Sequence, residues 1–271
     1  MKAKSFFSRA AAAPHIVWSV MFIVAPLLFV LYYALTDPNG AFTLSNIAAL
    51  PEYGGTFFLS ISLSLIATII CILIGYPMAY FISRAKPSRQ PLLLMAALVP
   101  MWINLLIRTF SMMAILDDGG LINTLLGTNL HIVGTKGAVI FGMVYDFLPY
   151  MILPIYTVMS KMDKRVLEAA SDLGCNHFEV LLRVVLPLTR SGIVSGVTMV
   201  FVPSISTFYI SQKLGGGTFE LLGDTIERQF ANPDTYNVGA AISLVMMVLI
   251  LLSMAIMNKF ADEDAEGGML P

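Results

Sequence analysis

The chain has 271 residues, of which 57% are hydrophobic and 12% are charged, and its formal net charge is −1. Soluble domains carry roughly 25% charged residues, so this chain has too few charges to cover a soluble surface. A net charge near zero also excludes the basic surface that nucleic-acid-binding proteins use. The apolar residues gather in runs near or above the ~20 residues that cross a membrane, which predicts an integral membrane protein.

Six membrane-spanning helices are predicted in chain order, within a single transmembrane domain over residues 1–271. Helices are expected because lipid offers backbone groups no hydrogen-bond partner, and because the runs are continuously apolar rather than alternating. The fold class is therefore all-α and polytopic. The predicted spans are about 15–35, 56–83, 91–116, 138–160, 190–212 and 238–258.

Several features modify these spans. The first apolar run is longer than the hydrophobic region of a signal peptide, and the small residues come before it rather than after it, so we expect an uncleaved span. Prolines inside the spans predict kinks, and they are Pro77, Pro100, Pro149, Pro154 and Pro203. The segment LINTLLG near Leu121 is a candidate short amphipathic helix, and the acidic tail, about 261–271, is expected to be disordered.

The distribution of lysine and arginine predicts the orientation. With the N-terminus inside the cell, twelve basic residues fall in inner segments and three in outer ones, namely Lys136, Lys213 and Arg228. Basic residues are enriched on the cytoplasmic side, so both termini and the segment 161–189 are expected to be cytoplasmic. The outer segments hold eight acidic residues, a charge that would attract a polycation.

The segment 161–189 is the most polar part of the chain. Asp163 is expected to cap a helix starting at Lys164, with Val166, Ala170 and Leu173 on one face. Gly174 suits a positive φ at the end of that helix. Asn176 and Glu179 have the spacing of a capping box for a second helix, expected to stop before Pro187. Periodicity leaves open whether the segment lies on lipid or docks a partner.

A longer pattern in this segment resembles a known family. Glu168-Ala169-Ala170 is followed by Gly174, then by Val184 and Leu186-Pro187. This arrangement resembles the EAA loop of ABC importer permeases, with Val184 in place of the usual isoleucine. The stretches LIGYPMAYFISR, LVPMWINLLIRTF, LPYMILPIY and FYISQKLGGG are similar to the permeases of spermidine/putrescine importers.

The resemblance implies a type I ABC importer permease in a bacterial inner membrane, forming half of a polyamine pathway. It implies docking of an ATPase through Glu168, Ala169, Ala170, Gly174, Leu186 and Pro187. The implied partners are two copies of an ATP-binding subunit, a second related permease and an extracellular binding protein. ATP and Mg are then held by the ATPase, and this chain lacks a phosphate-loop motif of its own.

Other functions remain open. Related permeases carry other small solutes, and a self-sufficient secondary transporter or channel would need an inverted repeat or an ion-coupling cluster, which we do not find. No enzyme activity is expected, because His15, His131 and His177 are scattered and no nucleophile–base pattern is present. Cys175 and His177 lack a second ligand pair, so no metal site or cofactor is expected.

Two charges fall inside the predicted spans, Arg108 and Asp146, and buried charges in membranes are candidates for function. They can form a structural pair, or Asp146, beside Tyr145, can contact a cationic substrate directly. Span five offers a second candidate pathway, because Pro203 frees carbonyls and aromatic faces suit alkylammonium ions. Its pathway residues would be Ser204, Thr207, Phe208 and Tyr209. The alternative is a kinked helix that packs through Gly192 and Gly196.

Overall fold

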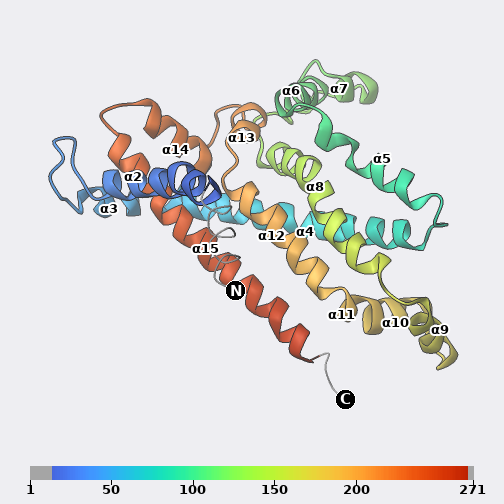
Figure 1. Cartoon of the computed structure of the whole chain (residues 1–271). Helices are drawn as coiled ribbons and strands as arrows, with labels where there is room; N and C mark the ends of the chain where they lie inside the picture. Colours follow the sequence, from blue (N-terminus) through green and yellow to red (C-terminus); the bar gives the residue numbers. More distant parts are fainter. Residues whose placement is uncertain (1–13, 268–271) are drawn as a thin grey trace, which may run out of the picture. The chain divides into compact units, whose positions relative to one another are not determined.

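The computed structural model describes residues 14–267, which form helices joined by loops (Figure 1). Within this range the only strand-like pairing is one isolated bridge between Thr36 and Phe42. The expected all-α fold is therefore confirmed. Four helices are long and apolar enough to cross a membrane alone, and two bent pairs raise the number to six if each pair counts as one span.

The four unbent candidates lie within a few residues of the predicted spans one, two, four and six. The first runs over Pro14–Ala34 and contains a π-helical turn, η1 (Val20–Val24), followed by α2 (Ala25–Ala34). The others are α4 (Gly54–Arg84), α8 (Lys136–Ser160) and α15 (Tyr236–Gly267). Many large apolar side chains on these helices are exposed, as expected for surfaces that face lipid.

The third span, predicted over 91–116 with a kink at Pro100, is bent and consists of two helices. α5 (Gln90–Trp102) and α6 (Leu105–Leu116) form a pair that bends by 90°. Pro100 lies in the last turn of α5, where it removes a backbone donor. Ile103 is extended, and Asn104 then caps α6 by accepting a hydrogen bond from Leu106 N at 2.8 Å.

The fifth span, predicted over 190–212 with a kink at Pro203, is also divided into separate helices. α12 (Arg190–Ile205) follows the preceding helical segment at a 70° bend, and it ends before three non-helical residues, 206–208. A separate helix, α13 (Tyr209–Leu214), comes next. Pro203 weakens the end of α12, and two serine hydroxyls donate to carbonyls there: Ser204 Oγ to Phe201 O and Ser206 Oγ to Pro203 O.

The chain divides into two compact units, and the larger one comprises residues 56–224 and 250–267 within the described range. Its centre is the packing of α8 against α12, which run beside one another in Figure 1. Small residues permit this approach: a Cβ at Gly196 would lie 2.7 Å from Met151 Sδ, and one at Gly192 would lie 3.0 Å from Pro154 O. These contacts support close packing through Gly192 and Gly196.

The smaller unit comprises residues 14–55 and 225–249 of the described range. It includes α3 (Ser45–Ala48), the 3₁₀ turn η2 (Leu50–Tyr53) and most of α14 (Leu222–Ala231). Asn46 and Asn237 are buried, and their amide nitrogens both donate to Thr36 O after the end of α2. These side chains supply partners for backbone groups that the helix end leaves free.

The tail differs from its predicted disorder, because α15 continues as far as Gly267. Its alanine and glutamate residues are good helix formers, which favours extension of the span. Residues 268–271, and the basic residues Lys2, Lys4 and Arg9, lie outside the described range.

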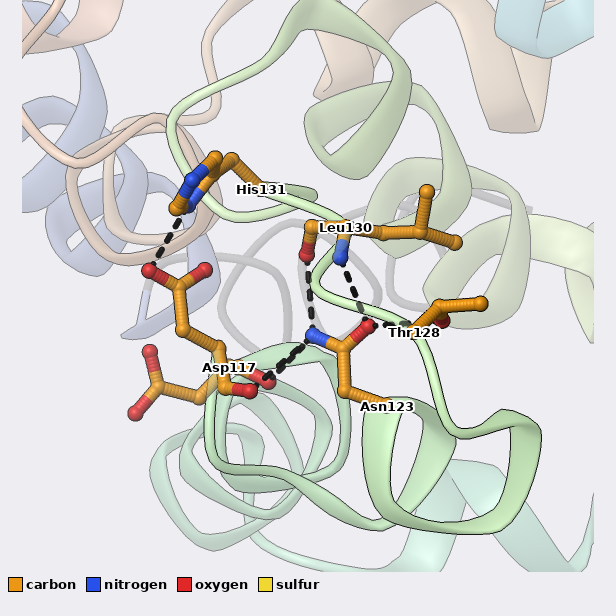
Figure 2. A network of polar contacts seen from close by, with 6 residues as sticks. Asp117, Asn123, Thr128, Leu130 and His131 are labelled. Atoms are coloured by element: carbon orange, nitrogen blue, oxygen red, sulfur yellow. Dashed lines mark hydrogen bonds and ion pairs between the residues drawn. The ribbon is translucent and has the colours of Figure 1, made fainter.

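A compact loop joins α6 to α8, and one side chain organises it (Figure 2). It contains α7 (Leu121–Leu126), which confirms the short helix expected there. Asn123 is buried, and its Nδ2 donates to Asp117 O, Asp118 O and Leu130 O at 3.2, 3.1 and 2.9 Å. Its Oδ1 accepts from Leu130 N at 2.8 Å. The loop is therefore held by an amide that uses both its donor and its acceptor groups.

Candidate functional site

The larger unit presents two candidate sites, one in the polar segment that follows α8 and one around Asp146, near the middle of α8. In Figure 1, α6, α7 and α13 lie at one end of α8, and the polar segment with α9, α10 and α11 lies at the other. α8 and α12 connect the two ends and pack against one another. The two candidate sites are therefore joined by the main helix contact of the unit.

The first helix of the polar segment, α9 (Lys164–Asp172), has the expected boundaries. Asp163 Oδ1 accepts a hydrogen bond from Arg165 N at 3.0 Å, which confirms the cap. Gly174 has φ +87°, and Cys175 N donates to Ala170 O at 3.2 Å, closing the helix end. A Cβ at Gly174 would meet nothing within 4 Å, so backbone conformation alone favours glycine there.

The second helix begins as expected but ends differently. Asn176 N donates to Glu179 Oε2 and Glu179 N donates to Asn176 Oδ1, both at 2.9 Å, which confirms the capping box before α10 (His177–Val180). The helix does not stop before Pro187. It continues through a π-turn, η3 (Leu181–Val185), into α11 (Leu186–Leu188), and Leu186 N donates a hydrogen bond to Leu181 O. Pro187 lies in the first turn of α11, where its missing N–H is tolerated.

The segment buries some apolar side chains and exposes others. Ala170, Val180 and Val185 are buried against the rest of the unit. The face predicted from Val166, Ala170 and Leu173 is not a uniform packing face, because α9 is short and only Ala170 reaches the core. Glu168 and Ala169 are exposed. The exposed apolar side chains are Val166 41%, Leu173 86%, Phe178 67% and Leu182 46%.

The junction between this segment and α12 depends on Thr189, which the sequence reasoning missed. Thr189 is fully buried at the 70° bend, and its Oγ1 donates to Val185 O at 2.8 Å. Tyr76 OH lies 3.1 Å from Thr189 Oγ1, and this contact joins the bend to α4. The signal available was a threonine two residues after a proline, because threonine hydroxyls bond back to i−4 carbonyls and bend helices.

The second candidate site contains the charges inside the spans. Arg108 Nε lies 2.5 Å from Asp146 Oδ1, and the two side chains are 10% and 2% exposed. The contact is a close ion pair without an aligned hydrogen bond, and neither Asp146 oxygen has a hydrogen-bond partner among residues 14–267. Arg108 Nη1 also donates to Pro100 O at 2.7 Å, so it joins α8 to the bend between α5 and α6.

A cavity of about 240 Å³ lies beside the ion pair. Arg108 and Tyr145 line it, and Arg108 Cζ is 5.7 Å from the centre of the Tyr145 ring. The other lining residues are mainly apolar: Ile103, Ser111, Met112, Ile115, Leu116, Ile122 and Phe141. Asp146 points its carboxylate at Arg108 and is not among the lining residues.

The residues expected in span five separate into two groups. Ser204 is fully buried with its hydroxyl bonded to Phe201 O, so it stabilises the helix end. Thr207 and Phe208 lie in the break between α12 and α13, and Phe208 is 43% exposed. Tyr209 begins α13, and its ring meets that of Phe110 edge to face at 6.2 Å. Phe110 is a further residue that the sequence reasoning missed.

Among residues 14–267, no three histidine, cysteine or acidic side chains lie close enough together to hold a metal ion. Cys71 is buried in α4, and Cys175 is half-buried after Gly174; both are free thiols.

Comparison with known proteins gives a consistent result. Residues 71–262 match the family described as binding-protein-dependent transport system inner membrane component. The chain is 37% identical to the spermidine/putrescine transport system permease protein PotB of Haemophilus influenzae, covering 96% of this chain and 97% of that protein. It is 35% identical to PotB of Escherichia coli, covering 88% and 92%.

Solved structures show the same fold at low sequence identity. A bacterial ABC transporter involved in the import of the acidic polysaccharide alginate matches with a TM-score of 0.73 and 15% identity, over 96% of each chain. The inward-facing MetNI methionine ABC transporter matches with a TM-score of 0.59 and 14% identity, over 77% of this chain and 94% of that chain.

The ion pair generates a stability prediction. Asp146→Asn or Arg108→Met leaves one buried charge without its partner, and each should lower the free energy of unfolding by about 3–5 kcal/mol. The double variant should recover much of this loss in stability. It should not recover the part that comes from the hydrogen bond between Arg108 and Pro100 O, which the double variant also lacks. Chemical unfolding in detergent measures the effect.

The exposed pair His131–Asp118, whose side chains are 79% and 59% exposed, provides the control. Asp118→Asn should change stability by less than about 1 kcal/mol. If Asp146→Asn is as stable as the parent chain, the pair does not stabilise the fold.

Proposed function

Because the chain belongs to the family of inner membrane components of binding-protein-dependent transport systems, we propose that it forms half of the membrane pathway of an ATP-driven polyamine importer. The observation that carries the substrate class is the likeness to two spermidine/putrescine permeases along nearly the whole chain. The protein is a multi-pass inner membrane permease.

The polar segment is the proposed docking site for an ATPase. Leu173, Phe178 and Leu182 are exposed although they are apolar, and such side chains suit burial by a partner. Glu168 and Ala169 are exposed on the same segment, Gly174 forms the corner between its two helices, and Pro187 lies near its end. Ala170 and Leu186 pack inward and support it. ATP and Mg would be bound by the partner.

The proposed orientation places the polar segment and both termini in the cytoplasm. The excess of basic residues in the predicted inner segments supports it. The loop with α7 lies at the opposite end of α8, so it would face the extracellular side (Figure 1). A binding protein that delivers substrate would meet the permease on that side.

The proposed assembly has a second permease, two ATPase copies and an extracellular binding protein. A related transporter has been solved in complex with its alginate pentasaccharide-bound periplasmic protein, which supports this kind of partner. The second permease would supply the other half of the pathway.

We place the pathway at Thr207, Phe208, Tyr209 and Tyr145. Phe208 lies exposed at the break between α12 and α13, and Tyr145 lines the cavity beside Arg108. Asp146 is engaged by Arg108, which favours a structural role over direct contact with substrate. Ser204 is assigned to the helix end rather than to the pathway.

Another small solute is the second candidate cargo. The fold itself does not select polyamines, because the structural neighbours serve alginate and methionine. A self-sufficient transporter or channel has no observation in its favour.

The proposed function is tested by uptake into liposomes that contain the permease with its co-purified chains. ATP-dependent accumulation of labelled spermidine or putrescine is expected, with a dependence on the binding protein. Glucose and methionine serve as neutral and zwitterionic comparison solutes. Uptake of either without polyamine uptake would refute the assigned cargo, and uptake without ATP or an ATPase would refute the importer class.

The polar segment generates a coupling prediction. A valine at position 174 is strained at φ +87°, so Gly174→Val should misplace α9. The amount of bound ATPase, or the ATP-driven uptake, should fall at least tenfold, which corresponds to a loss of ~1.4 kcal/mol in association. Glu168→Lys should have a smaller effect in the same direction. Co-purification, hydrolysis and uptake are measured together.

Gly127→Val is the matched control, because Gly127 also has a positive φ, also ends a helix and also has open space around its Cβ. This control should retain normal ATPase binding. Normal association, hydrolysis and uptake for Gly174→Val would show that the polar segment is only a surface loop.

The orientation is tested by thiol labelling in intact cells. Ser171→Cys, in a chain whose Cys175 is replaced by serine, should react with an impermeant reagent only after the membrane is opened. Leu125→Cys, at a 75% exposed position in α7, should react in intact cells. The reverse pattern would overturn the orientation and the docking assignment with it.

A further inference from the structure

The side chain of Lys213 lies over two aromatic rings. Its Nζ is 5.3 Å from the centre of the Phe110 ring and 5.9 Å from the centre of the Tyr209 ring. Both distances are within the ~6 Å at which an ammonium is attracted to a ring face. Tyr209 and Lys213 are four residues apart in α13 and therefore share one face of that helix.

The two rings come from different parts of the chain. Phe110 lies in α6, which packs against α13, and its ring meets the Tyr209 ring at an interplanar angle of 80°. Phe110 is 46% exposed and Lys213 is half-buried, so the ring pair is accessible from outside the helix contact. Lys213 takes part in none of the ion pairs found among residues 14–267, and its ammonium group contacts the two rings.

The group that the rings hold is a primary ammonium on a methylene chain. The ends of a linear polyamine are the same chemical group. A ring pair that accepts Lys213 Nζ therefore has the geometry to accept the end of such a substrate. Two ammonium groups compete for the site, because unit charges ~4 Å apart repel one another by about 1 kcal/mol even in water.

We propose that Phe110 and Tyr209 form a binding site for a primary alkylammonium, and that Lys213 occupies this site as a tethered competitor until substrate displaces it. The inference rests on the cationic cargo of the proposed function and adds a residue that sets the affinity for that cargo. The flexible four-carbon stem of lysine allows its ammonium to swing into water when substrate arrives.

A competitor tethered to the site weakens the apparent binding of substrate. Removing its charge should therefore strengthen binding, which is the opposite of what loss of a substrate ligand would do. Lys213→Met keeps the length and apolar stem of the side chain without the ammonium. Loss of the opposing cation should lower the KM for spermidine uptake by about fivefold, the factor that corresponds to ~1 kcal/mol.

Lys136→Met is the matched control for net charge. Lys136 is exposed in the first turn of α8, in a segment also proposed to be extracellular, and it is not over an aromatic ring. If Lys213 acted only through the net charge of the proposed extracellular segments, both variants would lower the KM equally. Lys213→Arg retains the cation and should keep the KM near that of the parent protein, whereas Phe110→Leu should raise it.

Displacement is measured directly by NMR on the reconstituted complex with ¹³C-dimethylated lysines, a modification that keeps the positive charge. The Lys213 signal, identified by its loss in Lys213→Arg, should be shifted by the ring currents of Phe110 and Tyr209. Spermidine and n-butylammonium should each move it towards the position of a free lysine, and n-butanol should not.

The outcomes separate this inference from the proposed function. If spermidine is transported while the Lys213 signal stays fixed at saturating substrate, the competitor is refuted and the function stands. If n-butylammonium displaces Lys213 but no polyamine is taken up, the site stands and the polyamine cargo is refuted. A Lys213→Met variant with unchanged or raised KM would also overturn the inference.

Discussion

Lipid gives a backbone carbonyl or N–H no hydrogen-bond partner, and this constraint accounts for the side chains found at each bend. At the bend between α5 and α6, Asn104 caps the second helix and Arg108 donates to Pro100 O. At the bend before α12, Thr189 donates to Val185 O and is held by Tyr76. The break after α12 has serine hydroxyls in the same role. Without these partners, breaks inside the apolar runs would cost several kcal/mol per unpaired group.

The positions of the spans could be predicted, but the sequence did not indicate which of their prolines would break a helix. Length and continuous hydropathy locate α4, α8 and α15, because these properties depend only on local composition. Proline is ambiguous: Pro77 lies inside α4 and Pro149 and Pro154 lie inside α8, whereas Pro100 and Pro203 lie beside breaks. Whether a proline ends a helix depends on the side chains and neighbouring helices that satisfy the freed carbonyl.

The same division holds for the candidate sites. The Asp163 cap, the Asn176–Glu179 box and the turn at Gly174 are encoded within a few residues, and the sequence predicted each of them. Arg108 and Asp146 were identifiable as partners because they are the only two charges away from the ends of the predicted spans. The contacts of Phe110 with Lys213 and of Tyr76 with Thr189 join residues more than one hundred positions apart. No local pattern indicates such pairs, since tertiary packing creates them.

At Gly174 the chirality of a side chain matters more than its size. Space around the missing Cβ is open, yet the backbone conformation is one that L-amino acids rarely adopt. A D-amino acid has the mirror-image preference, so D-alanine would fit where L-alanine is strained. Natural substitutions should then rank by their tolerance of this conformation, with asparagine ahead of alanine and β-branched residues last, whatever their volume. The end of α9 therefore depends on a backbone conformation that glycine or a D-residue can adopt. At this position a D-residue should fit better than an L-residue of the same size.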